Sequence, residues 1–274
     1  PVGGGPEVRR FKLFRVDPLS LTDILPIFTH MGVEVVDEQP FEVNRSDGET
    51  LNVYDFGLRV PDAATWDSVP HDRLRELFEG AVSAVWDGQA ESDGFNRLVL
   101  GAQLDWRQVV ILRAIAKYLR QTSATFSQDY FEDALVSHPG IARDLVALFE
   151  TRFDPSRYAG EAGADRTAAG EALGTSILEA LDEVSSLDHD RIIRSFLGVI
   201  RAGLRTNFYQ PGADGAAHKP YVSIKLNPKL VPDLPAPRPQ FEIWVYSPRV
   251  EGVHLRFGPV ARGGLRWSDR REDF

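Results

Sequence analysis

The sequence predicts an α+β fold, because segments with strand patterning and segments with helical patterning occupy separate regions of the chain. Residues 8–60 contain three segments in which apolar side chains alternate, with one helical segment between the first two. Residues 94–205 carry apolar side chains at helical spacing, and residues 221–267 return to short alternating segments separated by proline and glycine. A length of 274 residues is typical of about two domains.

The composition is that of a globular protein, and it excludes several functions. The 31 basic and 40 acidic side chains give a net charge of −9, so the chain should repel phosphate backbones, and we expect no nucleic-acid partner. No apolar run approaches the roughly 20 residues of a membrane helix, and the first residues lack the apolar core of a signal peptide. We therefore expect no membrane partner. Cysteine is absent, which excludes disulfides and thiolate chemistry and fits a cytoplasmic location.

Three strands are predicted in the first region, residues 1–90. They cover residues 8–16, 33–43 and 51–60, and we expect the second to be interrupted near Pro40, which cannot donate a ladder hydrogen bond. An Asp-Gly turn joins the last two segments, so they should form a hairpin.

Two helices are predicted in the same region. The first follows Ser20, a plausible N-cap, stops at Gly32 and contains Pro26, which should kink it. The second covers residues 72–86 and has one apolar face. The resulting β-α-β-β-α order resembles the ACT fold, a ferredoxin-like sandwich whose members often bind amino acids. That resemblance implies an amino-acid effector as one interpretation; a purely structural module is the other, and we favour it because fold does not determine function.

The middle region, residues 94–210, is predicted to be helical. Asp105 should cap a helix that continues to Gln121, and Asp188 and Asp190 should cap the last helix. Further helices are expected at 127–138, from Pro139, at 165–185 and at 190–205, with a Gly/Ala-rich link at 154–166. The last helix carries an apolar stripe, which we interpret as a packing surface or a subunit contact; it includes Ile192, Phe196 and Ile200.

The last region, residues 211–274, is predicted to contain the first strands of another domain. These are expected at 221–226, 241–247, 251–257 and 265–267. The proline-rich segment 227–240 should be an extended linker that lies over a surface, and residues 258–264 should form a tight glycine-rich turn.

That glycine-rich turn is the candidate site with the clearest chemistry. Gly263 and Gly264 lack side chains, so their backbone amides can approach an anion closely. Arg262 and Arg266 carry planar guanidinium groups that match carboxylates, which together suits a small dicarboxylate. The alternative is a hairpin turn with solvated arginines. The six histidines show no metal-ligand spacing, so no metal site is expected, and His254 is interpreted as a packed or surface side chain.

Three segments resemble the large NAD-specific glutamate dehydrogenases: RTNFYQ at 205–210, SIKL at 223–226 and the whole of 235–274. Within the last one, GPVARGGLRW also resembles the GP-x-KGG-x-R element that opens the substrate domain of the small hexameric enzymes. The resemblance implies that Arg262 stands where those enzymes have a lysine that binds a substrate carboxylate, with Gly263, Gly264 and Arg266 matching the rest. Arginine in place of lysine keeps the charge but changes reach and geometry.

The resemblance also implies the activity of the complete enzyme: an oxidoreductase of amino-acid catabolism that converts L-glutamate, NAD and water to 2-oxoglutarate, ammonia and NADH. A cytoplasmic, allosteric homo-oligomer is expected. The catalytic lysine, the catalytic aspartate and the NAD domain would lie beyond Phe274, so we predict that this segment alone neither binds NAD nor catalyses. Two alternatives remain open: an amino-acid-binding regulatory module, and an oligomerisation scaffold without catalysis.

Overall fold

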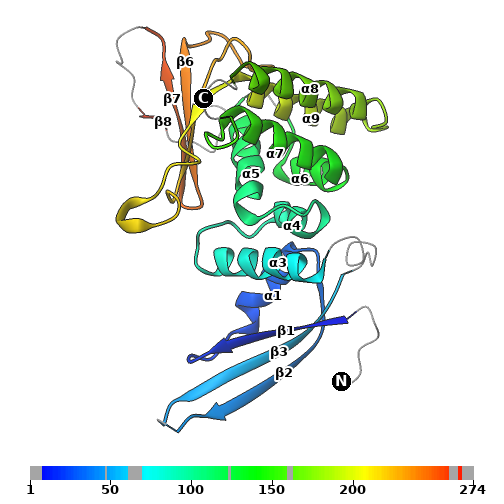
Figure 1. Ribbon diagram of the computed structural model, residues 1–274, viewed down its shortest axis with the longest axis vertical. Coiled ribbons are helices and arrows are strands. Elements are labelled where there is room, and N and C mark those ends of the chain that lie inside the picture. Colours follow the sequence, from blue (N-terminus) through cyan, green and yellow to red (C-terminus); the bar gives the residue numbers. More distant parts are fainter. Residues whose placement is uncertain are drawn as a thin grey trace.

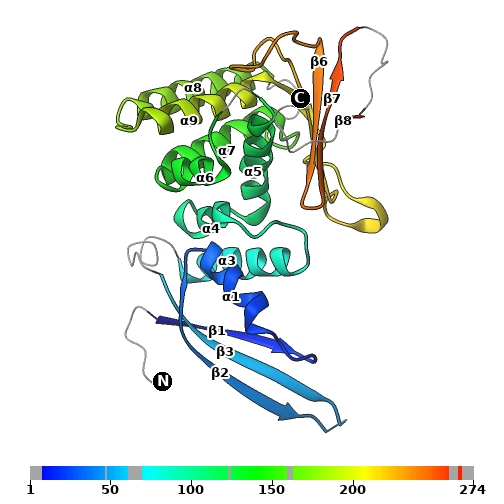
Figure 2. The same cartoon turned by 180° about the vertical axis from the view of Figure 1, so that it is seen from behind.

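A computed structural model of the chain describes residues 8–46, 48–60, 70–122, 125–158, 163–258 and 265–266. It contains two sheets with helices between and beside them, so the predicted α+β class is confirmed (Figure 1). The N-terminal sheet lies at one end of the molecule and helices α8 (Gly163–Leu181) and α9 (Leu187–Ala202) at the other, while the second sheet stands along the side of the helical layer (Figure 2). None of the helices in the described ranges is long and apolar enough to cross a bilayer.

The N-terminal sheet has three strands, β1 (Val8–Arg15), β2 (Glu34–Asn44) and β3 (Thr50–Arg59), in the order β1-β3-β2. Both outer strands run antiparallel to β3, and β2 and β3 form the predicted hairpin. Helices α1 (Leu21–His30) and α3 (His71–Trp86) cover one face (Figure 1). A ferredoxin-like sandwich has the strand order 4-1-3-2, and the observed order matches its first three strands. The described residues contain no fourth strand in this sheet.

Aromatic rings fill the space between this sheet and its helices. Phe28 on α1 and Phe56 on β3 are both 0% exposed, and their ring centroids lie 5.1 Å apart. Phe11 from β1 meets Phe78 from α3 edge-on at 5.4 Å. Phe14 also belongs to β1 but is 59% exposed, because its side chain lies on the opposite face of the strand.

The expected interruption of β2 at Pro40 is wrong. The strand continues through Pro40, which is paired with Tyr54, and its irregularity is a bulge between Val35 and Asp37. Because β2 is an edge strand, a proline nitrogen that faces away from β3 breaks no ladder hydrogen bond. The expected stop at Gly32 is confirmed: this glycine follows α1 with φ +76°.

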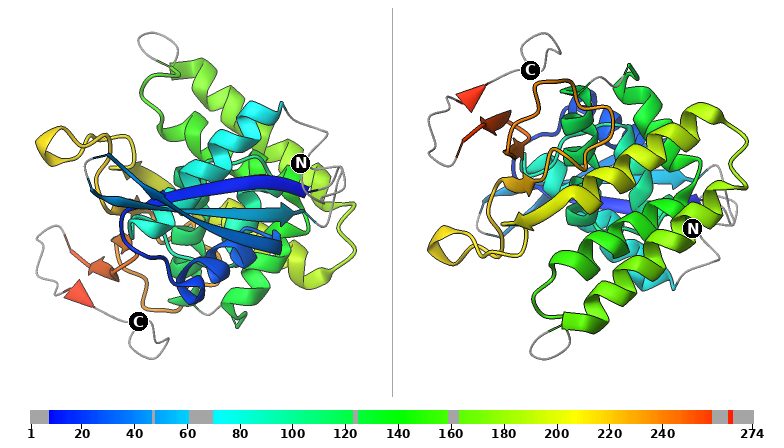
Figure 3. Two further views of the ribbon diagram at one scale, coloured as in Figure 1. Left: turned by 90° about the horizontal axis from the view of Figure 1, so that it is seen from below. Right: turned by 90° about the horizontal axis from the view of Figure 1, so that it is seen from above.

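The helical layer is built around α5 (Trp106–Arg120), in which ten residues are buried. The predicted cap is confirmed, since Asp105 Oδ1 accepts a hydrogen bond from Gln108 N at 2.8 Å and the Gln108 side chain accepts one from Asp105 N at 2.9 Å. The other elements of the layer are η1 (Gly94–Asn96), α4 (Arg97–Gly101), α6 (Gln128–Val136), α7 (Pro139–Phe153), α8 (Gly163–Leu181) and α9 (Leu187–Ala202). Seen along the long axis of the molecule, α7, α8 and α9 pack side by side (Figure 3).

The structure corrects the predicted end and N-cap of α9, and it decides between the two interpretations of its apolar stripe. The helix ends at Ala202 rather than residue 205, because strand β4 (Gly203–Thr206) begins there. Its N-cap is Ser186, whose side chain accepts a hydrogen bond from His189 N, so Asp188 and Asp190 lie inside the first turn instead of capping it. The apolar stripe is a packing surface of this chain and not a free subunit contact, since its members are at most 2% exposed: Ile192, Phe196 and Ile200.

The second sheet is an antiparallel meander in the order β4-β5-β6-β7-β8. The proline-rich segment between β5 and β6 lies over α9, as expected of a linker that follows a surface. A side chain at Gly198 would clash with Pro232, so the missing Cβ allows this close approach. The strands are β5 (Val222–Leu226), β6 (Phe241–Ser247), β7 (Val250–Arg256) and β8 (Leu265–Arg266).

Replacing Phe28 with alanine should destabilise the N-terminal module by about 3–5 kcal/mol, because it leaves a cavity among three other rings. The control is Phe14→Ala on the outer face of the same sheet, which should change the unfolding free energy by less than about 1 kcal/mol. Urea unfolding followed by far-ultraviolet circular dichroism measures both. Equal shifts for the two variants would contradict the assigned faces of the sheet.

Candidate functional site

The strands on either side of the glycine-rich segment are antiparallel neighbours, as the predicted hairpin requires. Arg266 lies in β8, where its backbone is in register with Val253 of β7. Arg262, Gly263 and Gly264 fall outside the described residues. The carboxylate-binding roles of all four residues therefore stay predictions. The flanking strands β7 and β8 lie at one edge of the second sheet (Figure 2).

The end of β7 that leads into the turn carries two polar side chains, His254 and Arg256, on one face of the strand. Arg256 Nε donates a hydrogen bond to the carbonyl of Gly258 at 3.1 Å. His254 is half-buried, as expected for a packed histidine, but its Nε2 atom is buried and has no hydrogen-bond partner among the described residues. An unpaired ring nitrogen beside the turn is free to bond a polar group supplied from outside these residues.

The sheet is attached to the helical layer along a buried seam between β6 and α5. Glu242, Trp244 and Tyr246 alternate on β6, so they share the face that meets α5, and each is at most 1% exposed. Trp244 Nε1 donates a hydrogen bond to the carbonyl of Ala114 at 2.8 Å. Tyr118 Oη donates one to Glu242 Oε2, and the Tyr118 and Trp244 rings meet edge-on at 5.8 Å. We call these five residues the β6 seam.

Glu242 is the titratable group of this seam. Burial raises its pKa to about 7, and the hydrogen bond from Tyr118 opposes that shift only in part. Its other oxygen, Oε1, has no hydrogen-bond partner among the described residues. The protonated form is therefore favoured below neutral pH, and ionisation places an incompletely solvated charge between the sheet and α5.

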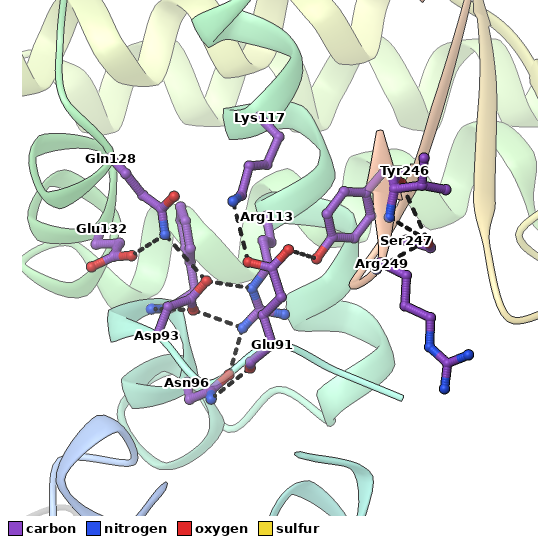
Figure 4. A network of polar contacts seen from close by, with 12 residues as sticks. Glu91, Asp93, Asn96, Arg113, Lys117, Gln128, Glu132, Tyr246, Ser247 and Arg249 are labelled. Carbon is purple, nitrogen blue, oxygen red and sulfur yellow. Dashed lines mark hydrogen bonds and ion pairs between the residues drawn. The ribbon is translucent and has the colours of Figure 1, made fainter. Parts of the chain in front are cut away.

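A second polar network surrounds Arg113, which is 0% exposed in the middle of α5 (Figure 4). Its Nε and Nη2 atoms each lie 2.8 Å from an oxygen of Asp93, and Nη2 also donates to Asn96 Oδ1. Burial is the largest single influence and lowers the pKa of Arg113, but the charge and hydrogen bonds of Asp93, together with smaller effects of Tyr246 and Glu91, outweigh it, so the net shift is upward. The arginine remains charged and bidentately paired.

The same network reaches the second sheet through Glu91. Tyr246 Oη donates a hydrogen bond to Glu91 Oε1 at 3.1 Å, and Lys117 Nζ lies 3.2 Å from Glu91 Oε2 (Figure 4). Residues 91–96 follow α3, the last helix of the N-terminal module. One short segment thus contacts the N-terminal module, α5 and β6, and fixes their relative positions.

Neither network was among the site residues predicted from the sequence. A signal was present for each: Arg113 interrupts the apolar run VVILRAIA at 109–116, and Glu242 lies in the apolar strand FEIWVYS at 241–247. A charged residue inside a buried apolar pattern indicates a paired interior group.

The histidines are less scattered than their spacing suggests. His138 Nε2 lies 3.2 Å from His189 Nδ1, and His189 Nε2 lies 3.3 Å from an oxygen of Asp133. Even so, the described residues contain no group of three or more side chains arranged to hold a metal ion.

Three family models match the chain, and all three describe parts of glutamate dehydrogenases. The glutamate dehydrogenase ACT3 domain matches residues 1–70, and the glutamate dehydrogenase helical motif 3 matches residues 90–155. The bacterial NAD-glutamate dehydrogenase catalytic domain matches residues 176–274, which includes α9 and the whole second sheet. The ACT-like expectation for the N-terminal module is thereby confirmed.

Curated relatives match along the full length of the chain. The chain is 46% identical to an NAD-specific glutamate dehydrogenase of Pseudomonas aeruginosa over 100% of its length, and 47% identical to one of Mycobacterium tuberculosis over 93%. An enzyme of the same name from Neurospora crassa is 31% identical over 58% of the chain. The chain spans only 17% of the first relative and 16% of the second. It belongs to the large NAD-specific glutamate dehydrogenase family, of which it represents a segment.

Replacing Arg113 with methionine should cost about 3–5 kcal/mol of unfolding free energy, because Asp93 loses its buried partner. Arg194→Met is the matched control: it removes an exposed ion pair with Asp190 and should cost less than about 1 kcal/mol. Urea unfolding of both variants measures the difference. A small loss for Arg113→Met would show that the network does not hold the segments together.

Glu242→Gln should make stability less sensitive to pH. The pKa of Glu242 is raised from the ordinary 4.5 to about 7 in the folded chain, so its contribution is fully present below the unfolded pKa and is lost as pH rises through the folded pKa. The stability of the parent should therefore fall relative to Glu242→Gln between about pH 4.5 and pH 7 and then level off. Urea unfolding at a series of pH values tests this, with exposed Glu179→Gln as the control. If the difference in unfolding free energy between the parent and Glu242→Gln stays constant with pH, the raised pKa of Glu242 is disproved.

Proposed function

We propose that the protein of which this chain is a segment oxidises L-glutamate with NAD and water to 2-oxoglutarate, ammonia and NADH. The observation that carries this proposal is the 46% identity along the entire chain to a curated NAD-specific glutamate dehydrogenase. The match to the catalytic domain reaches the last residue and contains the β7–β8 hairpin. We also propose that the chain is divided near residues 90 and 210 into the N-terminal ACT-like module, the helical region and the first strands of the catalytic domain.

The proposed contribution of this chain to catalysis is one wall of the substrate pocket. Arg262 and Arg266 would each hold a substrate carboxylate through paired hydrogen bonds, and Gly263 and Gly264 would bring backbone amides close to the same anion. The antiparallel pairing of β7 with β8 supports a tight turn between them. His254 Nε2, which has no hydrogen-bond partner among the described residues, adds a polar group on β7, the strand that precedes the glycine-rich segment.

The described residues do not fit a dinucleotide site. Such a site needs a parallel strand–glycine loop–helix unit, whereas all neighbouring strands of both described sheets are antiparallel. This supports the proposal that the remainder of the protein binds NAD. That the catalytic lysine and the catalytic aspartate also belong to the remainder is proposed from the resemblance to the family. On this basis the segment alone should be inactive.

Regulation and assembly are the proposed tasks of the N-terminal module and the helical layer. The ACT3 match supports an amino-acid effector. The proposal of a homo-oligomer rests on the resemblance to the family alone. A cytoplasmic location fits the absence of cysteine. Calorimetric titration of common amino acids into residues 1–90 tests the effector proposal, and silence across the set would remove it.

Steady-state kinetics of the full-length protein test the catalytic proposal. It should form NADH from NAD and L-glutamate, whereas residues 1–274 alone should not. Arg262→Met should lower kcat/KM for L-glutamate by about 30-fold or more, the equivalent of roughly 2 kcal/mol for a lost charged partner. Arg249→Met, in the exposed turn between β6 and β7, is the control and should leave kcat/KM unchanged. A full-length protein without glutamate-dependent NADH formation would refute the function, and an unaffected Arg262→Met would refute only the role of that residue.

A further inference from the structure

A cavity of about 520 Å³ opens between α7, α8 and the junction of α9 with β4, and three arginines line it. Arg152 comes from α7, Arg166 from α8 and Arg201 from α9. The lining contains a single acidic residue, Glu171, which is exposed. In a chain with more acidic than basic side chains, such a concentration of positive charge is unexpected.

None of the three guanidinium groups forms an ion pair with a carboxylate of the described residues. Arg152 Nη2 donates hydrogen bonds to the carbonyls of Arg201 and Gly203, at 3.1 and 3.0 Å. Arg166 Nη2 donates to the carbonyls of Asp154 and Tyr158. Other arginines of the chain do meet carboxylates, as Arg10, Arg113, Arg157 and Arg194 do.

The hydrogen-bonding capacity of two of these arginines is incompletely used. The Nε atoms of Arg152 and Arg166 are both buried, and neither has a hydrogen-bond partner among the described residues. Burial lowers the pKa of Arg152, and the nearby charge of Arg201 lowers it further. Unpaired buried donors and neighbouring like charges both cost free energy, which a bound anion would recover.

The third arginine, Arg201, packs its guanidinium group against a glycine of α8. A Cβ at Gly174 of α8 would clash with the guanidinium group of Arg201, so glycine at this position lets Arg201 lie across the helix. Gly170, one turn earlier, leaves the floor of the cavity open above Leu148. Glycines on one face of α8 therefore make room for the arginines and for a ligand beside them.

We propose that this three-arginine cavity binds a small molecule that carries two or more phosphate or carboxylate groups. A guanidinium group can form paired hydrogen bonds with a phosphate or with a carboxylate. Three guanidinium groups carry more positive charge than a ligand with one negative charge would neutralise. The volume lies within the range of small-molecule sites, and Leu148, Phe153 and Leu204 offer apolar surface to the rest of the ligand. A zwitterionic amino acid fits less well, because its ammonium group would face the arginines.

Isothermal titration calorimetry on the full-length protein tests this with two probes, pyrophosphate and tricarballylate. Either probe should bind at millimolar concentration or below, and Arg201→Gln should weaken that binding at least tenfold. The exposed side chain of Arg201 forms no hydrogen bond or ion pair with the described residues, so this variant should remain folded. Arg166→Gln serves as a second variant with the same expectation, and Arg191→Gln, which removes one exposed charge elsewhere on α9, should bind like the parent.

The pattern of binding identifies the chemistry. Pyrophosphate alone would indicate a phosphate-bearing ligand, tricarballylate alone a polycarboxylate, and both a general polyanion site. The proposal is overturned if neither probe binds, or if both Arg201→Gln and Arg166→Gln bind as tightly as Arg191→Gln. Loss of binding in all three variants would also count against it, because the effect would then follow net charge rather than the cavity.

Discussion

The pairing of Arg113 with Asp93 is the constraint on which the arrangement of the chain depends. A guanidinium group cannot lose its proton under ordinary conditions, so an arginine with no exposed surface must keep an anionic partner. That partner comes from the segment between the N-terminal module and the helical layer, and the neighbouring Glu91 bonds the second sheet. Because both carboxylates belong to one short segment, the position of either sheet is tied to α5.

This arrangement gives α5 its central place. One side of the helix meets residues 91–96, and another takes part in the β6 seam, where α5 accepts a hydrogen bond from the Trp244 indole and donates one from Tyr118 to the Glu242 carboxyl group. The strand that carries the seam is the direct neighbour of β7, and β7 leads into the turn proposed to hold substrate. The frame of that turn therefore rests on buried side chains of the helical layer, as precise positioning of a binding site requires.

Local patterns in the sequence predicted the elements well and their environment less well. Alternation and helical spacing located the long helices and the strands of both sheets except β4, because those signals are contained in a few neighbouring residues. The edge position of β2, which makes Pro40 acceptable, is a property of the whole sheet and cannot be read locally. Strand β4 has four residues, too few to show alternation beside a long helix.

For the candidate sites too, local patterns predicted the elements but not the contacts between distant parts of the chain. The flanks of the glycine-rich turn were predicted from patterning, whereas the roles of Arg262 and Arg266 came from resemblance to a family. The partners of Arg113 and the three arginines of the cavity were not predicted, since each group is assembled from elements far apart in the sequence. Single charged residues inside apolar runs indicate that a partner exists but not which one.

Pro40 also affects how the N-terminal sheet can grow. A strand at the rim of a sheet presents unused backbone donors and acceptors, and an additional chain can join it there. On β2 the proline removes one donor near the middle of the rim and the bulge at Val35 and Asp37 distorts the line of the others, so strand addition is discouraged on that side. Of the two rims of the described sheet, β1 is the one left regular, and it is where a ferredoxin-like sandwich places its remaining strand. The sheet can thus be extended in one direction while the other is protected against aggregation.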